Sequence, residues 1–196
     1  MISRLALTLS LGIVLSFGAY AVEKPKKIKK HTTLGLYLTA AEVHKKITTN
    51  NKKVLFIDVR TRAEVNFLGM PSQADANIPY MVMPEFYSWN KKKHSFTLKP
   101  NNDFSNAVEK RLKAKGLDKN SEVILMCRSG SRSAKAVNLL AKLGYKNVYT
   151  VVDGYEGGKA KSGLTKGQRT VDGWKNSKLP WTYKLDAQKM YQVSAN

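Results

Sequence analysis

Short runs of consecutive apolar residues alternate along the chain with longer segments in which apolar residues recur every three or four positions. The apolar runs lie at residues 54–59, 123–126 and 148–152, and only Asp58 interrupts the first. Runs of this length are typical of strands that are covered on both faces in a parallel sheet. Residues 76–79 predict a further short strand near an edge, because Pro79 cannot donate a hydrogen bond to a neighbouring strand.

The segments between these runs predict amphipathic helices. They lie at residues 39–48, 61–68, 104–115 and 133–143. Thr39 and Glu42 open the first helix at the spacing of a capping box. Gly116 and Gly144 follow the last two helices, where a left-handed C-cap residue is favoured. Because strands and helices alternate, the sequence predicts an α/β fold.

Two longer stretches do not fit this alternation. Residues 80–102 hold Phe86, Tyr87, Trp89 and Phe96 beside the three lysines at 91–93, and residues 157–172 are rich in glycine and lysine. Stretches of this length without a clear element are usually surface loops, many of them functional. We therefore predict two surface insertions within one domain.

The first residues have the layout of a secretory signal peptide. Arg4 precedes an apolar run at residues 5–17, and Ala19 and Ala21 form an A-x-A cleavage pattern. The run is shorter than the roughly 20 residues of a membrane-spanning helix. We expect residues 1–21 to be removed, the mature protein to be exported to the periplasm, and no stable membrane insertion to remain after cleavage. Residues 22–33, with five lysines, are expected to form a flexible basic leader.

The chain is strongly basic. Its formal net charge is +20, and +19 remains without residues 1–21, in which Arg4 is the only charged residue. Nucleic acid is the usual partner of such charge, but an exported protein rarely meets it, and neither an RNA-binding signature nor zinc-finger spacing is present. We expect no nucleic acid partner. An anionic membrane surface, an acidic protein partner and a lysine-rich soluble surface without a partner remain open.

Cys127 is the only cysteine, so the chain cannot form an internal disulfide. In an oxidising compartment an unpaired cysteine is either a small buried apolar residue or a reactive thiol. The histidines His31, His44 and His94 share no metal-ligand spacing with one another or with Cys127, so no metal site is expected.

The residues around Cys127 favour the reactive thiol. Cys127 directly follows an apolar strand, and the next helix is predicted to begin at about Ser133. The free amides and the dipole of a helix N-terminus create a positive field that favours a thiolate or a persulfide anion. Arg128 and Arg132 add positive charge, and Gly130 lets the backbone approach the anion closely.

Three serines complete the loop: Ser129, Ser131 and Ser133. Their hydroxyls can donate hydrogen bonds to the anion or cap the helix. Together with the two arginines and Gly130 they are the predicted substrate-binding residues, and Cys127 is the predicted nucleophile.

The loop Cys127-Arg128-Ser129-Gly130-Ser131-Arg132-Ser133 resembles the Cys-Arg-x-Gly-x-Arg-Ser loop of single-domain rhodaneses. The segment Asp58-Val59-Arg60 with Glu64 resembles the opening of these domains, and Gly173-Trp174 with Leu179-Pro180-Trp181 resembles their closing elements. The resemblance covers residues 34–182 and leaves 183–196 as a tail. It implies a small, mainly parallel sheet of about five strands in a three-layer fold with helices on both faces. Met70 departs from the family pattern in a region that lies near the mouth of the site in rhodaneses.

The resemblance also implies a sulfurtransferase. Cys127 would take a sulfur atom from a small anion such as thiosulfate or from a persulfide, hold it as a persulfide, and pass it to a thiol or cyanide without a cofactor. Cysteine phosphatases are the nearest rival, but they use Cys-x5-Arg, whereas Arg132 stands one position closer to the cysteine. A non-enzymatic rhodanese-like sulfur carrier, sensor or docking module for a partner protein is the alternative from another class.

Four residues outside the loop are further candidates for the pocket: Asp58, Arg60, Met70 and Tyr155. Arg60 and Glu64 are four residues apart across a strand-to-helix turn, which favours a structural ion pair between them over a catalytic role. Tyr155 follows the last predicted strand, where ligands of parallel sheets bind, but it can equally pack in the core.

Overall fold

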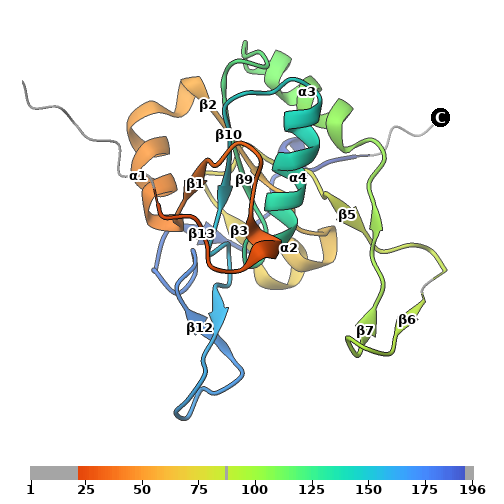
Figure 1. Ribbon diagram of the computed structural model, residues 1–196. Helices are drawn as coiled ribbons and strands as arrows, with labels where there is room; N and C mark the ends of the chain where they lie inside the picture. Colours follow the sequence, from red (N-terminus) through yellow and green to blue (C-terminus); the bar gives the residue numbers. More distant parts are fainter. Residues whose placement is uncertain (1–21, 87, 193–196) are drawn as a thin grey trace, which may run out of the picture.

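A five-stranded parallel sheet forms the centre of the domain. The computed structural model describes residues 22–86 and 88–192. The strands run in the spatial order β1 (Tyr37–Leu38), β10 (Val148–Val151), β9 (Glu122–Met126), β2 (Val54–Asp58) and β4 (Ala76–Asn77), and all neighbours pair in parallel (Figure 1). The predicted α/β fold class is confirmed. The edge strand β1 was not predicted, because two residues are too few to produce a periodic signal.

Four helices cover the two faces of the sheet, which makes three layers. α1 (Ala40–Asn50) and α2 (Arg62–Leu68) pack on one face, and α3 (Phe104–Ala114) and α4 (Ser131–Lys142) on the other. Successive side chains of a strand point to opposite faces. Accordingly, Phe56 of β2 packs with α1 and α2, whereas Leu55 and Ile57 pack with α3 and α4.

Local sequence signals explain where the helices begin and end. The Thr39 hydroxyl accepts a hydrogen bond from the Glu42 amide at 3.2 Å, and the Glu42 carboxylate accepts one from the Thr39 amide at 2.7 Å, which confirms the predicted capping box. Thr61 and Glu64 form a second capping box at the start of α2. Gly116 and Gly144 have φ values of 69° and 89°, as expected for left-handed C-caps.

α4 begins two residues earlier than predicted. Gly130 adopts a left-handed conformation with φ 92° and occupies the N-cap position. Its carbonyl accepts the hydrogen bond from the Ala134 amide at 3.3 Å. Ser131 and Arg132 are therefore part of the first helical turn, and the loop proper is only four residues long, from Cys127 to Gly130.

The two insertions contain short antiparallel pairs. In the first, β5 (Met81–Val82) pairs with β8 (Lys99–Pro100), and β6 (Trp89–Asn90) pairs with β7 (Ser95–Phe96). In the second, β11 (Gly158–Lys159) pairs with β12 (Arg169–Val171). Both insertions project from the body of the domain in Figure 1.

The closing part of the chain returns to the sheet. β13 (Trp181–Thr182) pairs with β3 (Met70–Pro71), so the closing Trp181 lies next to the segment in which Met70 departs from the family pattern. After the short 3-10 helix η3 (Ala187–Lys189), the Tyr191 amide donates a hydrogen bond to the Asn77 carbonyl at 2.9 Å. This contact places the end of the described chain along β4.

The segment before β1 is bound to the domain. The short 3-10 helix η1 (Ile28–Lys30) lies within the stretch predicted to be a flexible leader. The Thr33 amide donates to Asn138 Oδ1 at 2.8 Å, and Asn138 Nδ2 donates to the His31 carbonyl at 3.3 Å. These hydrogen bonds tie residues 31–33, the end of the predicted leader, to α4.

The predicted signal peptide, residues 1–21, lies outside the described residues. Among the residues that the structure describes, no helix has the length and apolar character needed to cross a membrane.

Replacement of Thr39 by Ala should lower the free energy of unfolding by about 1 kcal/mol, because the Glu42 amide loses its acceptor at the start of α1. Urea unfolding followed by circular dichroism measures the change. Thr49→Ala, at the exposed end of the same helix, is the matched control. Equal effects of the two substitutions would contradict a specific role of the capping box.

Candidate active site

Cys127 lies at the carboxyl end of β9, immediately before the N-terminus of α4. The side chain is buried, with 1% of its surface exposed. Its sulfur accepts a hydrogen bond from the Gly130 amide at 3.2 Å and one from the Ser133 hydroxyl at 3.4 Å. Two donors therefore converge on the sulfur at a helix N-terminus, an arrangement that stabilises negative charge there.

The Ser133 hydroxyl is itself held in place. It lies 2.8 Å from the Thr150 hydroxyl of β10, and both residues are completely buried. If Thr150 donates to Ser133, the proton of Ser133 stays available for the sulfur. β10, which lies on the opposite side of β9 from β2, thus orients a hydrogen-bond donor to Cys127.

The turn after β10 fixes the backbone of the Cys127 loop. The Tyr155 amide donates to the Cys127 carbonyl at 2.8 Å, and the Glu156 amide donates to the Arg128 carbonyl at 3.0 Å. Gly154 packs so closely against the loop that a Cβ atom there would lie 2.5 Å from the Cys127 carbonyl oxygen and 2.6 Å from the Ser129 amide nitrogen. Only glycine fits at this position.

Arg132 is bound to an acidic side chain. Its guanidinium donates to both carboxylate oxygens of Glu64 at 2.6 and 2.5 Å. Burial alone would raise the pKa of Glu64, but the hydrogen bonds and charge of Arg132 lower it to about 2. The pair joins α4 to α2, so Arg132 connects two elements of the core. This finding corrects the predicted Arg60–Glu64 ion pair.

Arg128 is also paired. Its Nε donates to the Glu156 carboxylate at 2.5 Å, while 46% of its side chain remains exposed. Ser129 and Ser131 are partly exposed beside it. The structure therefore brings the predicted loop residues together around Cys127, but carboxylates already offset the charges of both loop arginines.

Arg60 pairs with Asp58 instead of Glu64. Its Nε donates to both Asp58 oxygens at 3.0 Å, and its Nη2 donates to one of them at 2.6 Å. The guanidinium carbon lies 3.7 Å from the centroid of the Tyr155 ring. Burial acts to lower the pKa of Arg60, but the Asp58 carboxylate outweighs it and raises that pKa above its usual value.

The four further pocket candidates are all buried. Asp58, Arg60 and Tyr155 are 0% exposed, and Met70 is 2% exposed. Tyr155 donates its hydroxyl to the Leu68 carbonyl at 2.9 Å. The four side chains are therefore part of the core. Arg60 Nη2 also donates to the Gly69 carbonyl at 2.7 Å, while Arg60 Nη1 is buried without a hydrogen-bond partner among the described residues.

A family model described as a rhodanese-like domain matches residues 39–161. The chain belongs to the rhodanese-like domain family. An uncharacterised protein of Rickettsia conorii is 31% identical over 134 residues, which are 68% of this chain and 87% of that protein. An uncharacterised homologue of Rickettsia rickettsii is 32% identical over 136 residues, with the same coverage of 68% and 87%.

A solved structure shares the fold. The crystal structure of Rv0390 from M. tuberculosis superposes with a TM-score of 0.57 at 24% identity, and the match covers 76% of this chain and 97% of that one. It supports the rhodanese-like fold of the domain, with the Cys127 loop between the central strand and the helix that follows it.

Two cations beside the Cys127 loop lie outside the residues matched by the family model. Lys30 of η1 donates to the Val152 carbonyl, against which Gly130 of the loop packs. Arg169 of β12 donates to the carbonyl of Gly157, which follows the turn that holds the loop. The sequence offered no signal for either, since both belong to stretches without periodicity that are remote from residue 127 along the chain. Only the folding of these stretches against the domain reveals them.

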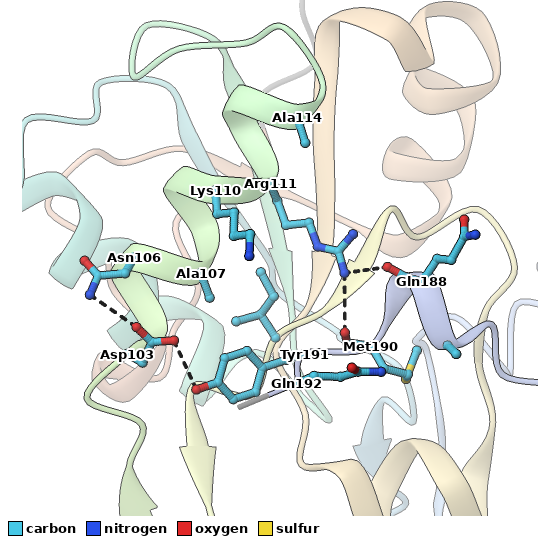
Figure 2. A pocket seen from close by; sticks show the side chains of 12 residues that line it. Asp103, Asn106, Ala107, Lys110, Arg111, Ala114, Gln188, Met190, Tyr191 and Gln192 are labelled. Atoms are coloured by element: carbon cyan, nitrogen blue, oxygen red, sulfur yellow. Dashed lines mark hydrogen bonds between the residues drawn. The ribbon is translucent and has the colours of Figure 1, made fainter. Parts of the chain in front are cut away.

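A groove elsewhere on the domain does not involve the Cys127 loop. Figure 2 shows it between α3 and the C-terminal segment, where Arg111 donates to the Gln188 and Met190 carbonyls and Tyr191 donates to Asp103. None of the residues that line it belongs to the loop. Within residues 22–86 and 88–192, no cluster of three or more His, Cys, Asp or Glu side chains could hold a metal ion.

The Glu64–Arg132 pair should make stability depend on pH in acid. Glu64 has its pKa near 2 in the folded protein and near 4.5 in the unfolded chain, so its stabilising effect is complete above about pH 4.5 and is lost as the pH falls through 2. At about 1.4 kcal/mol per pKa unit, the effect is at most about 3.5 kcal/mol.

Unfolding free energies measured from pH 7 to pH 2 test this expectation. Glu64→Gln should show a smaller decrease over this range than the unsubstituted protein. Glu109→Gln removes a carboxylate from an exposed helical pair with Lys113 and serves as the control. A decrease in Glu64→Gln as steep as that of the control would contradict the assignment.

Proposed function

We propose that the protein is a sulfurtransferase in which Cys127 carries sulfur as a persulfide. The observation that carries this proposal is the convergence of the Gly130 amide and the Ser133 hydroxyl on the Cys127 sulfur at the start of α4. A buried cysteine with a purely structural role has no need of two donors aimed at its sulfur. A thiolate or persulfide anion is stabilised by them.

The reaction is a double displacement. The Cys127 thiolate attacks the outer sulfur of a donor such as thiosulfate or a persulfide. A new sulfur–sulfur bond forms at Cys127, and the old one breaks with its electron pair on the leaving anion, which is sulfite for thiosulfate. A thiol or cyanide then takes the outer sulfur and regenerates the thiolate.

The short loop suits this chemistry better than phosphoryl transfer. Arg132, at the position from which an arginine would reach a bound oxyanion, is engaged with Glu64 through both of its terminal nitrogens. With this arginine occupied, the loop has amides and a hydroxyl left for the anion on Cys127. This favours a single anionic sulfur on the cysteine over a tetrahedral phosphate.

Mass spectrometry of the purified protein before and after incubation with thiosulfate tests the proposal. We expect the mass to increase by one sulfur atom on Cys127 and the added sulfur to leave when cyanide is added. Cys127→Ser, which retains a small side chain in the buried site, should gain no sulfur. A protein that gains no sulfur from thiosulfate or from inorganic polysulfide would contradict the enzyme assignment.

Ser133→Ala should slow persulfide formation about tenfold, because one of the two donors to the sulfur is removed in a buried site. Single-turnover kinetics with thiosulfate measures the rate. Ser131→Ala removes a partly exposed hydroxyl from the same helical turn and is the matched control. Equal rates in the two variants would show that the Ser133 hydroxyl does not act on the sulfur.

A non-enzymatic sulfur carrier or docking module is the second candidate. The observation that favours it is the exposure of large apolar side chains beside lysines on the first insertion. Phe86 is 85% exposed and Trp89 is 53% exposed, close to the lysines at 91–93. Exposed aromatic side chains close to lysines suit an acidic protein partner. Export to the periplasm through removal of residues 1–21 remains part of this proposal.

A further inference from the structure

The positively charged side chains around the Cys127 loop differ in whether a carboxylate pairs with them. Arg132 is paired with Glu64, and Arg128 is paired with Glu156. The guanidinium of Arg169, in contrast, donates from Nη1 to an uncharged acceptor, the Gly157 carbonyl, at 2.7 Å. Among residues 22–86 and 88–192, no ion pair neutralises the charge of Arg169, which lies beside the turn that supports the Cys127 loop.

The position of Arg169 is fixed by the base of the β11–β12 hairpin. Gly157, whose carbonyl accepts from Arg169, directly follows Glu156, which contacts Arg128 of the loop through both its amide and its carboxylate. Asn176 Nδ2 lies within hydrogen-bond distance of the Glu156, Arg169 and Asp172 carbonyls. The hairpin base is thereby joined to the backbone that supports the Cys127 loop.

Arg169 also has unused hydrogen-bonding capacity. Its Nε is buried and has no hydrogen-bond partner among the described residues. A buried donor without an acceptor is unfavourable, and a shift of this partly exposed side chain toward a bound anion would give Nε an acceptor. The planar guanidinium fork matches the oxygens of sulfonate, sulfate and related oxyanions.

The electrostatic surroundings of Arg169 favour a bound anion. Burial and the charge of Arg128 lower the pKa of Arg169, whereas Glu156 and Cys127 raise it. Lys30 adds a second positive charge: its Nζ donates to the Val152 carbonyl at 2.6 Å, and both Cys127 and Asp153 act on it. A bound dianion would offset the repulsion that Arg128 and Arg132 exert on Arg169.

We propose that Arg169 binds the oxyanion end of the sulfur donor and so presents the outer sulfur of that donor to Cys127. The proposal rests on the proposed sulfurtransferase function and adds to it a binding residue for an anionic donor such as thiosulfate, in a hairpin outside the Cys127 loop. In the transfer, the bond from Cys127 to the outer sulfur forms as the sulfur–sulfur bond of thiosulfate breaks. The bonding electron pair leaves with sulfite, which Arg169 holds until it dissociates.

Equilibrium binding separates this site from the chemistry. In the Cys127→Ser background no sulfur can be transferred, so titration calorimetry with sulfite and with thiosulfate reports anion binding alone. Arg169→Gln in that background should weaken the binding of both anions at least about tenfold. Arg169→Lys, which keeps the charge without the fork, should recover part of the loss.

Lys166→Gln is the matched control, because it removes one positive charge from an exposed position of the same hairpin. Its anion affinity should stay within about twofold of the parent. Unchanged affinity in Arg169→Gln, or an equal loss in Lys166→Gln, would overturn the proposal, the second by showing that only the general charge of the hairpin matters.

Transfer kinetics in the otherwise unsubstituted protein gives the second measurement. Arg169→Gln should raise the KM for thiosulfate about tenfold and leave persulfide formation from inorganic polysulfide, which has no sulfonate group, within about twofold. Equal losses with both donors would overturn the proposal. A wild-type protein that takes sulfur from neither donor would instead refute the proposed function, while the calorimetric titration would still decide whether Arg169 binds the anion.

Discussion

Two backbone hydrogen bonds connect the turn after β10 to the loop after β9, from the Tyr155 amide to the Cys127 carbonyl and from the Glu156 amide to the Arg128 carbonyl. They hold the loop with its carbonyls facing the turn. The Gly130 amide is then left to point at the Cys127 sulfur. Gly154 permits this close approach, since any side chain there would collide with the loop backbone. The surroundings of the Cys127 sulfur therefore depend on two neighbouring parallel strands that end at the same edge of the sheet.

The same edge of the sheet gathers charges that the fold must balance. α2 and α4 cover opposite faces, and both begin at the carboxyl end of a strand, so Glu64 in the first turn of α2 meets Arg132 in the first turn of α4. This contact uses a loop arginine to join the two layers. The buried Asp58–Arg60 pair packs against the ring of Tyr155, whose amide holds the Cys127 carbonyl. Arg169, which forms no ion pair among the described residues, is the cation that the proposed anion site uses.

Three segments outside the central sheet and its helices add charged and aromatic side chains to this domain. The basic stretch before β1 binds to α4 and brings Lys30 toward Cys127, and the β11–β12 hairpin does the same for Arg169. The other insertion follows β4 and exposes aromatic side chains beside lysines. A common rhodanese-like core thus carries additions that change the electrostatic surroundings of its cysteine and the surface that a partner would meet.

The sequence by itself determined the α/β class, the three central strands, the capping box of α1, the glycine C-caps and the position of Cys127 between a strand and a helix. These features follow from local periodicity and from side chains that act within a few residues. Only the tertiary structure decided which charges meet. Glu64 pairs with Arg132, 68 positions away, and not with Arg60, which is nearer in the chain. Lys30 and Arg169 reach Cys127 from opposite ends of the sequence. Ion pairs and hydrogen bonds depend on distance in space. The crossover connections of a parallel sheet bring together residues that are far apart along the chain, and the sequence alone does not indicate which of them will meet.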